Sequence, residues 1–297
     1  MKAYFYRPED CPGVEWVSGG LSFPTVEKTN NPSEADCFVL PNDLCHYTNE
    51  QLRALPYLNG NERRHVFLAI TENPERTIGI PAIIFRCDAT RHLLKSDPTM
   101  IAWGWPSEDW YDPNAKFERD IFFQGQAGAT GLTIRACESI KKSELSAHIH
   151  ILDTFYGVYE VNQPEYAKQL KQQYVQLLRT SRLSLCASTK PEHVIRYRFY
   201  EALAAGRIPV LVGDYSLRAL EGRVNYSKCS LWIPEKNVDN IGNFLKEWLL
   251  SHPDEELLEM GRYGYSMWKE WMNPQDWGKN WERIVLEKLK EIDASAN

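Results

Sequence analysis

The feature that most constrains the fold of this chain is an alternation of short apolar runs with helix-length segments. The run His65-Val-Phe-Leu-Ala-Ile-Thr71 is apolar almost throughout, which is typical of a strand buried on both faces of a parallel sheet. Strands that alternate with helices over short connections predict parallel sheets covered by helices. In the N-terminal part the expected strands are residues 2–6, 35–41 (ended by Pro41), 65–71, 82–86 and 100–103, with a helix over 49–55.

A polar, proline-containing stretch at residues 106–115 separates this series from a second one. The second series has expected strands at 120–123, 148–152, 183–187, 208–212 and 230–233, and helices at 133–142, 164–179, 191–205, 241–250 and over most of 254–292. The 297 residues are enough for two cores. We therefore predict an α/β protein with two Rossmann-like domains, residues 1–112 and 113–270, whose parallel sheets face a cleft. A C-terminal helix within 271–297 is expected to pack back on the first domain.

Charge and cysteine content exclude several classes of protein. The net charge of −6 argues against a general nucleic-acid binder and against electrostatic docking on an anionic membrane. No apolar stretch reaches about 18 residues, and the N-terminus lacks the apolar core of a signal peptide. Seven widely spaced cysteines without a C-x-x-C pair predict reduced thiols and no zinc site. A cytoplasmic protein without a membrane span is expected.

The unit from residue 188 to 214 contains the strongest candidate site. Ser188 or Thr189 can cap the expected helix, in which Arg198 and Glu201 lie one turn apart on one face. A guanidinium matches phosphate oxygens, and a carboxylate suits paired hydroxyls. Because ligands of parallel sheets bind at the carboxyl ends of strands, where such helices begin, the sequence predicts a binding site here. The alternative is an ordinary ion pair on a solvated helix face.

A glycine-rich turn lies between the strand over 120–123 and the helix over 133–142. Gly125, Gly128 and Gly131 do not form a G-x-G-x-x-G fingerprint. Free amides at such a turn and at a helix N-terminus can still bind a phosphate, and Arg135 would add charge one turn into the helix. The alternative is an ordinary flexible turn.

The string Arg198-Phe-Tyr-Glu-Ala-Leu-Ala-Ala-Gly-Arg-Ile-Pro-Val-Leu-Val-Gly-Asp214 resembles the exostosin-like glycosyltransferases. Ser181-Arg-Leu-Ser-Leu-Cys186 is similar to the preceding strand of that family, and the stretches 31–41 and 121–125 with Arg135 are similar to other parts of it. The chain departs from the family at Arg196, where a Ser is common. The resemblance implies a GT-B fold and inverting sugar transfer without a metal. It also implies a nucleoside-diphosphate sugar, with a UDP-sugar favoured, as the donor.

The same resemblance implies the roles of the site residues. Arg198 would bind the diphosphate and Glu201 the ribose, and the other expected donor-binding residues are Arg135, Gly125, Arg196, Ser188 and Tyr156. Tyr156 follows the strand over 148–152, where its ring could stack on a nucleobase or simply fill the core. His148 and His150 have no third partner at metal-binding spacing.

Inverting transfer needs a base that removes a proton from the acceptor hydroxyl. Glu72 and Asp88 are the preferred candidates, because each follows a strongly apolar strand. Asp43, Glu108 and Asp109 are weaker candidates. Each of these carboxylates could instead be an ordinary surface group.

Three functions remain open at this point. The first is a glycosyltransferase that acts on a glycan acceptor and needs no cofactor beyond its donor. The second is a non-catalytic nucleotide or sugar-binding module on the same scaffold. The third is a NAD-dependent oxidoreductase, which would need a dinucleotide fingerprint that the sequence lacks.

Overall fold

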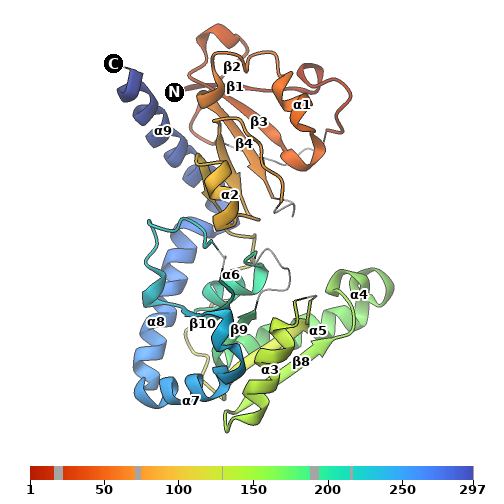
Figure 1. Ribbon diagram of the computed structural model, residues 1–297, viewed down its shortest axis with the longest axis vertical. Coiled ribbons are helices and arrows are strands. Elements are labelled where there is room, and N and C mark those ends of the chain that lie inside the picture. The colour runs from red at the N-terminus through yellow and green to blue at the C-terminus, as the bar shows by residue number, and fades with distance from the viewer. Residues whose placement is uncertain (17–22, 71–74, 129, 188–193, 215–216, 297) are drawn as a thin grey trace. The chain divides into compact units, whose positions relative to one another are not determined.

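The structure is a computed structural model that describes residues 1–16, 23–70, 75–128, 130–187, 194–214 and 217–296 (Figure 1). The chain divides into two compact units. Unit 1 comprises Met1–Trp105, Leu217–Leu220 and Pro274–Asn297, and unit 2 comprises Pro106–Ser216 and Glu221–Asn273. Each unit is described by itself.

Unit 1 is built on a six-stranded sheet in the order β2-β1-β3-β4-β5-β6, in which every pair of neighbours is parallel. The strands are β1 (Lys2–Phe5), β2 (Glu27–Thr29), β3 (Cys37–Asp43), β4 (His65–Ala69), β5 (Ile83–Arg86) and β6 (Met100–Ala102), and the helices are α1 (Asn49–Arg53), α2 (Arg91–Ser96) and α9 (Trp277–Ala296). All five residues of β4 are buried, as its apolar sequence predicts.

The C-terminal helix α9 completes the core of unit 1 through aromatic contacts. The ring centroids of Trp281 and Phe85 lie 5.8 Å apart, and those of Trp281 and Trp103 also lie 5.8 Å apart. Arg64 forms an ion pair with Asp293 near the end of the helix. Helix α9 therefore belongs to the unit formed by the other end of the chain.

Unit 2 is built on a five-stranded parallel sheet in the order β11-β10-β9-β7-β8. Its strands are β7 (Arg119–Gln126), β8 (Ala147–Leu152), β9 (Ser181–Ala187), β10 (Ile208–Val212) and β11 (Leu231–Ile233), and its helices are α3 (Leu132–Lys142), α4 (Tyr156–Asn162), α5 (Pro164–Arg179), α6 (Tyr197–Ala204), α7 (Ile241–Ser251) and α8 (Asp254–Met267). A π-helical turn, Trp268–Met272, continues α8.

Helices cover both faces of the sheet of unit 2. Ile121 and Phe123 of β7 pack in one core with residues of α3 and α7. Phe122, which points to the opposite face, packs in a second core with residues of α5 and α6. Side chains of successive residues alternate between the faces of a strand, so β7 is buried on both sides. The prediction of two Rossmann-like α/β units with parallel sheets is confirmed.

The boundary between the units lies after Trp105, whereas the sequence predicts it after residue 112. The segment that follows Trp105 packs on α8 and its π-helical continuation. Ser107 accepts a hydrogen bond from Trp268 Nε1 at 2.7 Å, and the ring of Tyr111 stacks on that of Tyr265 with centroids 4.1 Å apart. These contacts assign the segment to unit 2.

Among the element boundaries that differ from the predictions, those of β3 and α6 have a clear physical cause. Strand β3 does not end at Pro41 but continues to Asp43, and its register with β4 shifts between Val39 and Asp43. This irregularity accommodates Pro41, which has no N–H for a regular ladder. Helix α6 begins at Tyr197 rather than near residue 191, so the predicted helix start is wrong. Val194 and Ile195 precede it as buried, non-helical residues.

No helix within the described residues is both long and apolar enough to cross a membrane. Six of the seven cysteines are buried: Cys11, Cys37, Cys87, Cys137, Cys186 and Cys229. Burial raises the pKa of the Cys37 thiol to about 12, so this sulfur is protonated and acts as a small apolar group.

Candidate active site

Arg198 lies in the first turn of α6, at the edge of the sheet where β7 ends. Its Nε donates to the carbonyl oxygen of Gln124 at 3.0 Å, and its guanidinium carbon lies 4.8 Å from the centre of the Phe123 ring. The side chain is only partly buried. Its two terminal nitrogens have no hydrogen-bond partner among the described residues. Arg198 is therefore oriented by β7 while most of its donors remain available to an anion.

Gly125 allows Arg198 to lie against β7. Its φ of +150° is a conformation that side chains rarely adopt. A Cβ atom added at Gly125 would lie 1.6 Å from Arg198 Nη2 and 2.5 Å from its guanidinium carbon. Gly125 and Arg198 are 73 positions apart in the sequence, but they lie in contact and form one part of the candidate site.

Glu201 lies one turn after Arg198 on α6 and is held by α5. The hydroxyl of Tyr174 donates to Oε2 of Glu201 at 2.6 Å. Burial raises the pKa of Glu201 above its ordinary value, while the Tyr174 hydrogen bond and the charge of Arg198 oppose the rise. The carboxylate thus lies in a weakly solvated environment in which hydrogen bonds to a ligand are strengthened.

A second pair of charges borders this carboxylate. Lys171, one turn before Tyr174 on α5, donates through Nζ to Oε1 of Glu108 at 2.5 Å. This contact lowers the pKa of Glu108 and raises that of Lys171. The ion pair is half exposed. The segment after Pro106 and helix α5 therefore both bring polar groups to the neighbourhood of Glu201.

The N-terminus of α3 follows the glycine-rich turn. Gly131 adopts a left-handed conformation at φ +72° and caps the helix without a side-chain hydrogen bond. Thr133 and Gln124 are buried, and Thr133 Oγ1 and Gln124 Oε1 have no hydrogen-bond partner within the described parts of the chain. Buried polar atoms without partners are uncommon and often occur at functional sites. Neither residue is predicted from the sequence, because a single Thr or Gln carries no distinctive pattern.

The other predicted donor-binding residues are placed differently. Arg135 forms a two-pronged pair with Asp239, through Nε at 2.9 Å and Nη2 at 2.6 Å. Arg196 is the N-cap residue of α6, and Tyr156 donates from its hydroxyl to the carbonyl of Ala167 at 3.0 Å, which joins α4 to α5. Ser188 lies outside the described residues. The structure brings together Gly125, Arg198 and Glu201 but gives Arg135 and Tyr156 protein partners.

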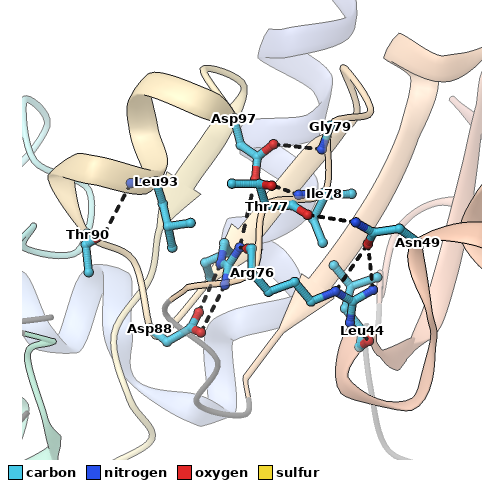
Figure 2. A network of polar contacts seen from close by, with 11 residues as sticks. Leu44, Asn49, Arg76, Thr77, Ile78, Gly79, Asp88, Thr90, Leu93 and Asp97 are labelled. Carbon is cyan, nitrogen blue, oxygen red and sulfur yellow. Dashed lines mark hydrogen bonds and ion pairs between the residues drawn. The ribbon is translucent and has the colours of Figure 1, made fainter.

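Of the two preferred candidates for the base, Glu72 lies outside the described residues and Asp88 lies in unit 1. Asp88 is fully buried, and Arg86 donates to both of its carboxylate oxygens, each at 3.0 Å. Arg86 also donates to the carbonyl of Arg76 at 2.7 Å. Figure 2 shows Asp88 within this polar network at the carboxyl end of β5. The geometry gives Asp88 a structural partner, and its role as a base stays a prediction.

The same network fixes the segment that leads into β5. Asp97 accepts hydrogen bonds from the backbone N–H groups of Ile78 and Gly79, each at 2.9 Å, while Arg76 donates to Asn49 and to the carbonyl of Leu44 (Figure 2). Within the described residues, no group of three or more His, Cys, Asp or Glu side chains is placed to hold a metal ion.

Comparison with known proteins finds a family match over most of unit 2. Residues 108–248, which contain Gly125, Arg198 and Glu201, match the model of the exostosin GT47 domain. The protein is accordingly a glycosyltransferase. The match does not reach residues 31–41, where the sequence also resembles this family. No curated protein matches the chain in a sequence comparison.

Solved structures with a distant likeness to the chain include those of HepE and TarM. Anabaena HepE in complex with UDP is 9% identical, with a TM-score of 0.43 over 88% of this chain and 71% of that one. HepE in complex with UDP-glucose is 10% identical, with a TM-score of 0.43 over 86% and 72% of the two chains. TarM is 11% identical, with a TM-score of 0.48 over 84% of this chain and 55% of its own.

Proposed function

We propose that the protein transfers a sugar from a nucleoside-diphosphate sugar, with a UDP-sugar favoured, to a hydroxyl of a glycan acceptor. The observation that carries this proposal is Arg198, a partly exposed guanidinium that β7 orients and whose terminal nitrogens have no described protein partner. Its fork of donors matches the oxygens of a diphosphate. Glu201, one turn further along α6, would accept hydrogen bonds from the ribose hydroxyls.

The chemistry of transfer is the finer part of the proposal. The charge on the departing diphosphate would be stabilised by Arg198 and by the amide groups at the start of α3 rather than by a divalent ion. Inversion at the sugar carbon is expected from the resemblance to the exostosin-like enzymes, and it requires one base, for which Glu72 and Asp88 are the candidates. The buried free thiols suit a reducing compartment, and we place the protein in the cytoplasm.

The test is nucleotide binding by thermal shift, followed by hydrolysis of the matching nucleotide-sugar. UDP is expected to raise the melting temperature, whereas NAD is not. Arg198→Gln should weaken UDP binding about 10- to 100-fold, because charge-assisted hydrogen bonds to phosphate are lost. Lys168→Gln on the exposed side of α5 is the control that removes a charge elsewhere. Unchanged UDP affinity in Arg198→Gln contradicts the proposed donor site.

Metal independence and the non-catalytic alternative are tested with the same protein. Activity should persist in excess EDTA, and the product should have the anomeric configuration opposite to that of the donor. A protein that binds UDP but never cleaves a nucleotide-sugar, with or without acceptors, would be a binding module.

A further inference from the structure

The hydroxyl of Tyr174 makes one of the shortest side-chain contacts in unit 2, and it goes to Glu201. The Oη–Oε2 separation is 2.6 Å, which is typical of a hydrogen bond from a hydroxyl to a carboxylate. On the basis of the donor site described above, we propose that Tyr174 is a positioning residue for the donor. The Tyr174 hydroxyl fixes the Glu201 carboxylate so that the other carboxylate oxygen faces the ribose hydroxyls.

The ring of Tyr174 is itself fixed by aromatic packing. Its centroid lies 5.8 Å from that of Trp110 and 5.2 Å from that of Phe122, with edge-on geometry in both pairs. All three rings contribute to the core between the sheet and α5 and α6. A hydroxyl on a ring held in this way cannot follow Glu201 if the carboxylate rotates, so the contact selects one rotamer of Glu201.

Glu201 needs such a restraint because the rest of its surroundings does not supply one. The contact with Tyr174 is the one hydrogen bond of its carboxylate to a described residue. Burial disfavours its charged form, and the charge of Arg198 acts on it without a described hydrogen bond. A long side chain with two carboxylate oxygens loses rotamer entropy when a ligand orders it. By ordering Glu201 beforehand, Tyr174 reduces that cost for the donor.

The test is binding of three nucleotides to the full chain and to Tyr174→Phe, measured by calorimetry. The nucleotides are UDP, its 2′,3′-dideoxy counterpart and UMP. Tyr174→Phe should weaken UDP binding about 3- to 10-fold. The preference for UDP over the dideoxy nucleotide should fall by a similar factor, while the preference for UDP over UMP, which reports on Arg198, should not change.

Tyr265→Phe is the matched control. Tyr265 also donates from its hydroxyl to a carboxylate, Asp109 Oδ2 at 3.0 Å, and also belongs to unit 2. Its removal should leave all three affinities unchanged, so a general effect of losing a Tyr–carboxylate hydrogen bond is separated from a specific one. If Tyr174→Phe merely perturbed the fold, the affinities for all three nucleotides would fall by the same factor, and the proposal would be wrong.

The pH profile gives an independent readout. The Tyr174 hydrogen bond lowers the pKa of Glu201, so its removal should raise that pKa further. If the charged carboxylate binds the ribose, UDP affinity is lost as the pH falls through this pKa, and the loss should begin at a higher pH in Tyr174→Phe. The other titratable groups that act on Glu201 or respond to its charge are Lys171, Glu108, Arg198 and Cys186.

The outcomes distinguish this inference from the proposed function. UDP binding to the unmodified protein with an undiminished dideoxy preference in Tyr174→Phe overturns the positioning role and leaves the donor site intact. Failure of the unmodified protein to bind UDP, or to prefer it over the dideoxy nucleotide, overturns both.

Discussion

At the scale of single residues, the placement of Arg198 depends on an amino acid that has no side chain. Gly125 leaves the space that the Arg198 guanidinium occupies, and Phe123 supplies the ring beside it. The position of the Arg198 guanidinium therefore depends on the lack of a side chain at position 125. The glycine-rich sequence predicts a phosphate-binding turn at Gly125, whereas the structure shows Gly125 in contact with Arg198.

Gly125→Ala should reduce UDP affinity at least about tenfold. The new Cβ would overlap Arg198 Nη2, so the guanidinium must leave its place against β7. Isothermal calorimetry with UDP measures the change. Gly60→Ala is the control, because Gly60 also has a positive φ of +81° but open space around it. It should lower stability without altering affinity, and equal losses of affinity in both variants would contradict the steric argument.

The secondary-structure elements show where local sequence decides and where it does not. Helix α5 has the predicted bounds, Pro164–Arg179, because Pro164 suits the first turn and the apolar residues recur with helical spacing. Helix α6 begins several residues later than expected, because Val194 and Ile195 are buried ahead of it instead of continuing it. Packing overrides a local start signal in the second case.

Close contact between α8 and the end of α6 provides a prediction at this scale. A Cβ on Gly261 would lie 2.2 Å from the carbonyl oxygen of Gly206, whereas one on Gly264 would meet Leu203 and Cys229 side-chain atoms at 3.0 and 3.1 Å. Both changes to Ala favour the helix by about 1 kcal/mol. We expect Gly261→Ala to destabilise the protein by about 1–3 kcal/mol and Gly264→Ala to be nearly neutral. Urea denaturation measures the change in the free energy of unfolding for each variant. Similar changes in the two variants would contradict the backbone contact of Gly261.

At the scale of the whole molecule, the two ends of the chain form one unit. Pro274–Asn297 belongs with Met1–Trp105 although the whole of unit 2 lies between them in the sequence. Thr25 donates a hydrogen bond from its backbone N–H to Oε2 of Glu282 at 3.1 Å, which joins the N-terminal region to α9. The stability of unit 1 therefore depends on residues at the far end of the chain.

Trp281→Ala should destabilise unit 1 by about 3–5 kcal/mol, because it removes a buried ring that contacts Phe85, Trp103 and Trp277. Hydrogen exchange measured by mass spectrometry should show lost protection in β4, β5 and β6 and retained protection in β7, β9 and β10. Phe244→Ala on α7 removes a ring that is 43% exposed, so it should change neither the stability of unit 1 nor the protection of either sheet. Equal loss of protection in both sheets would contradict the assignment of α9 to unit 1.

The sequence by itself determined the two parallel sheets, the bounds of α5 and β10, and the candidate role of α6. These follow from local apolar periodicity and from the family string, which act over a few neighbouring residues. Only the tertiary structure decided that Arg198 lies on Gly125, that Tyr174 holds Glu201, and that Arg135 pairs with Asp239, 104 positions away. Contacts between residues so distant in the chain depend on how strands are ordered and helices packed, and no local pattern records them.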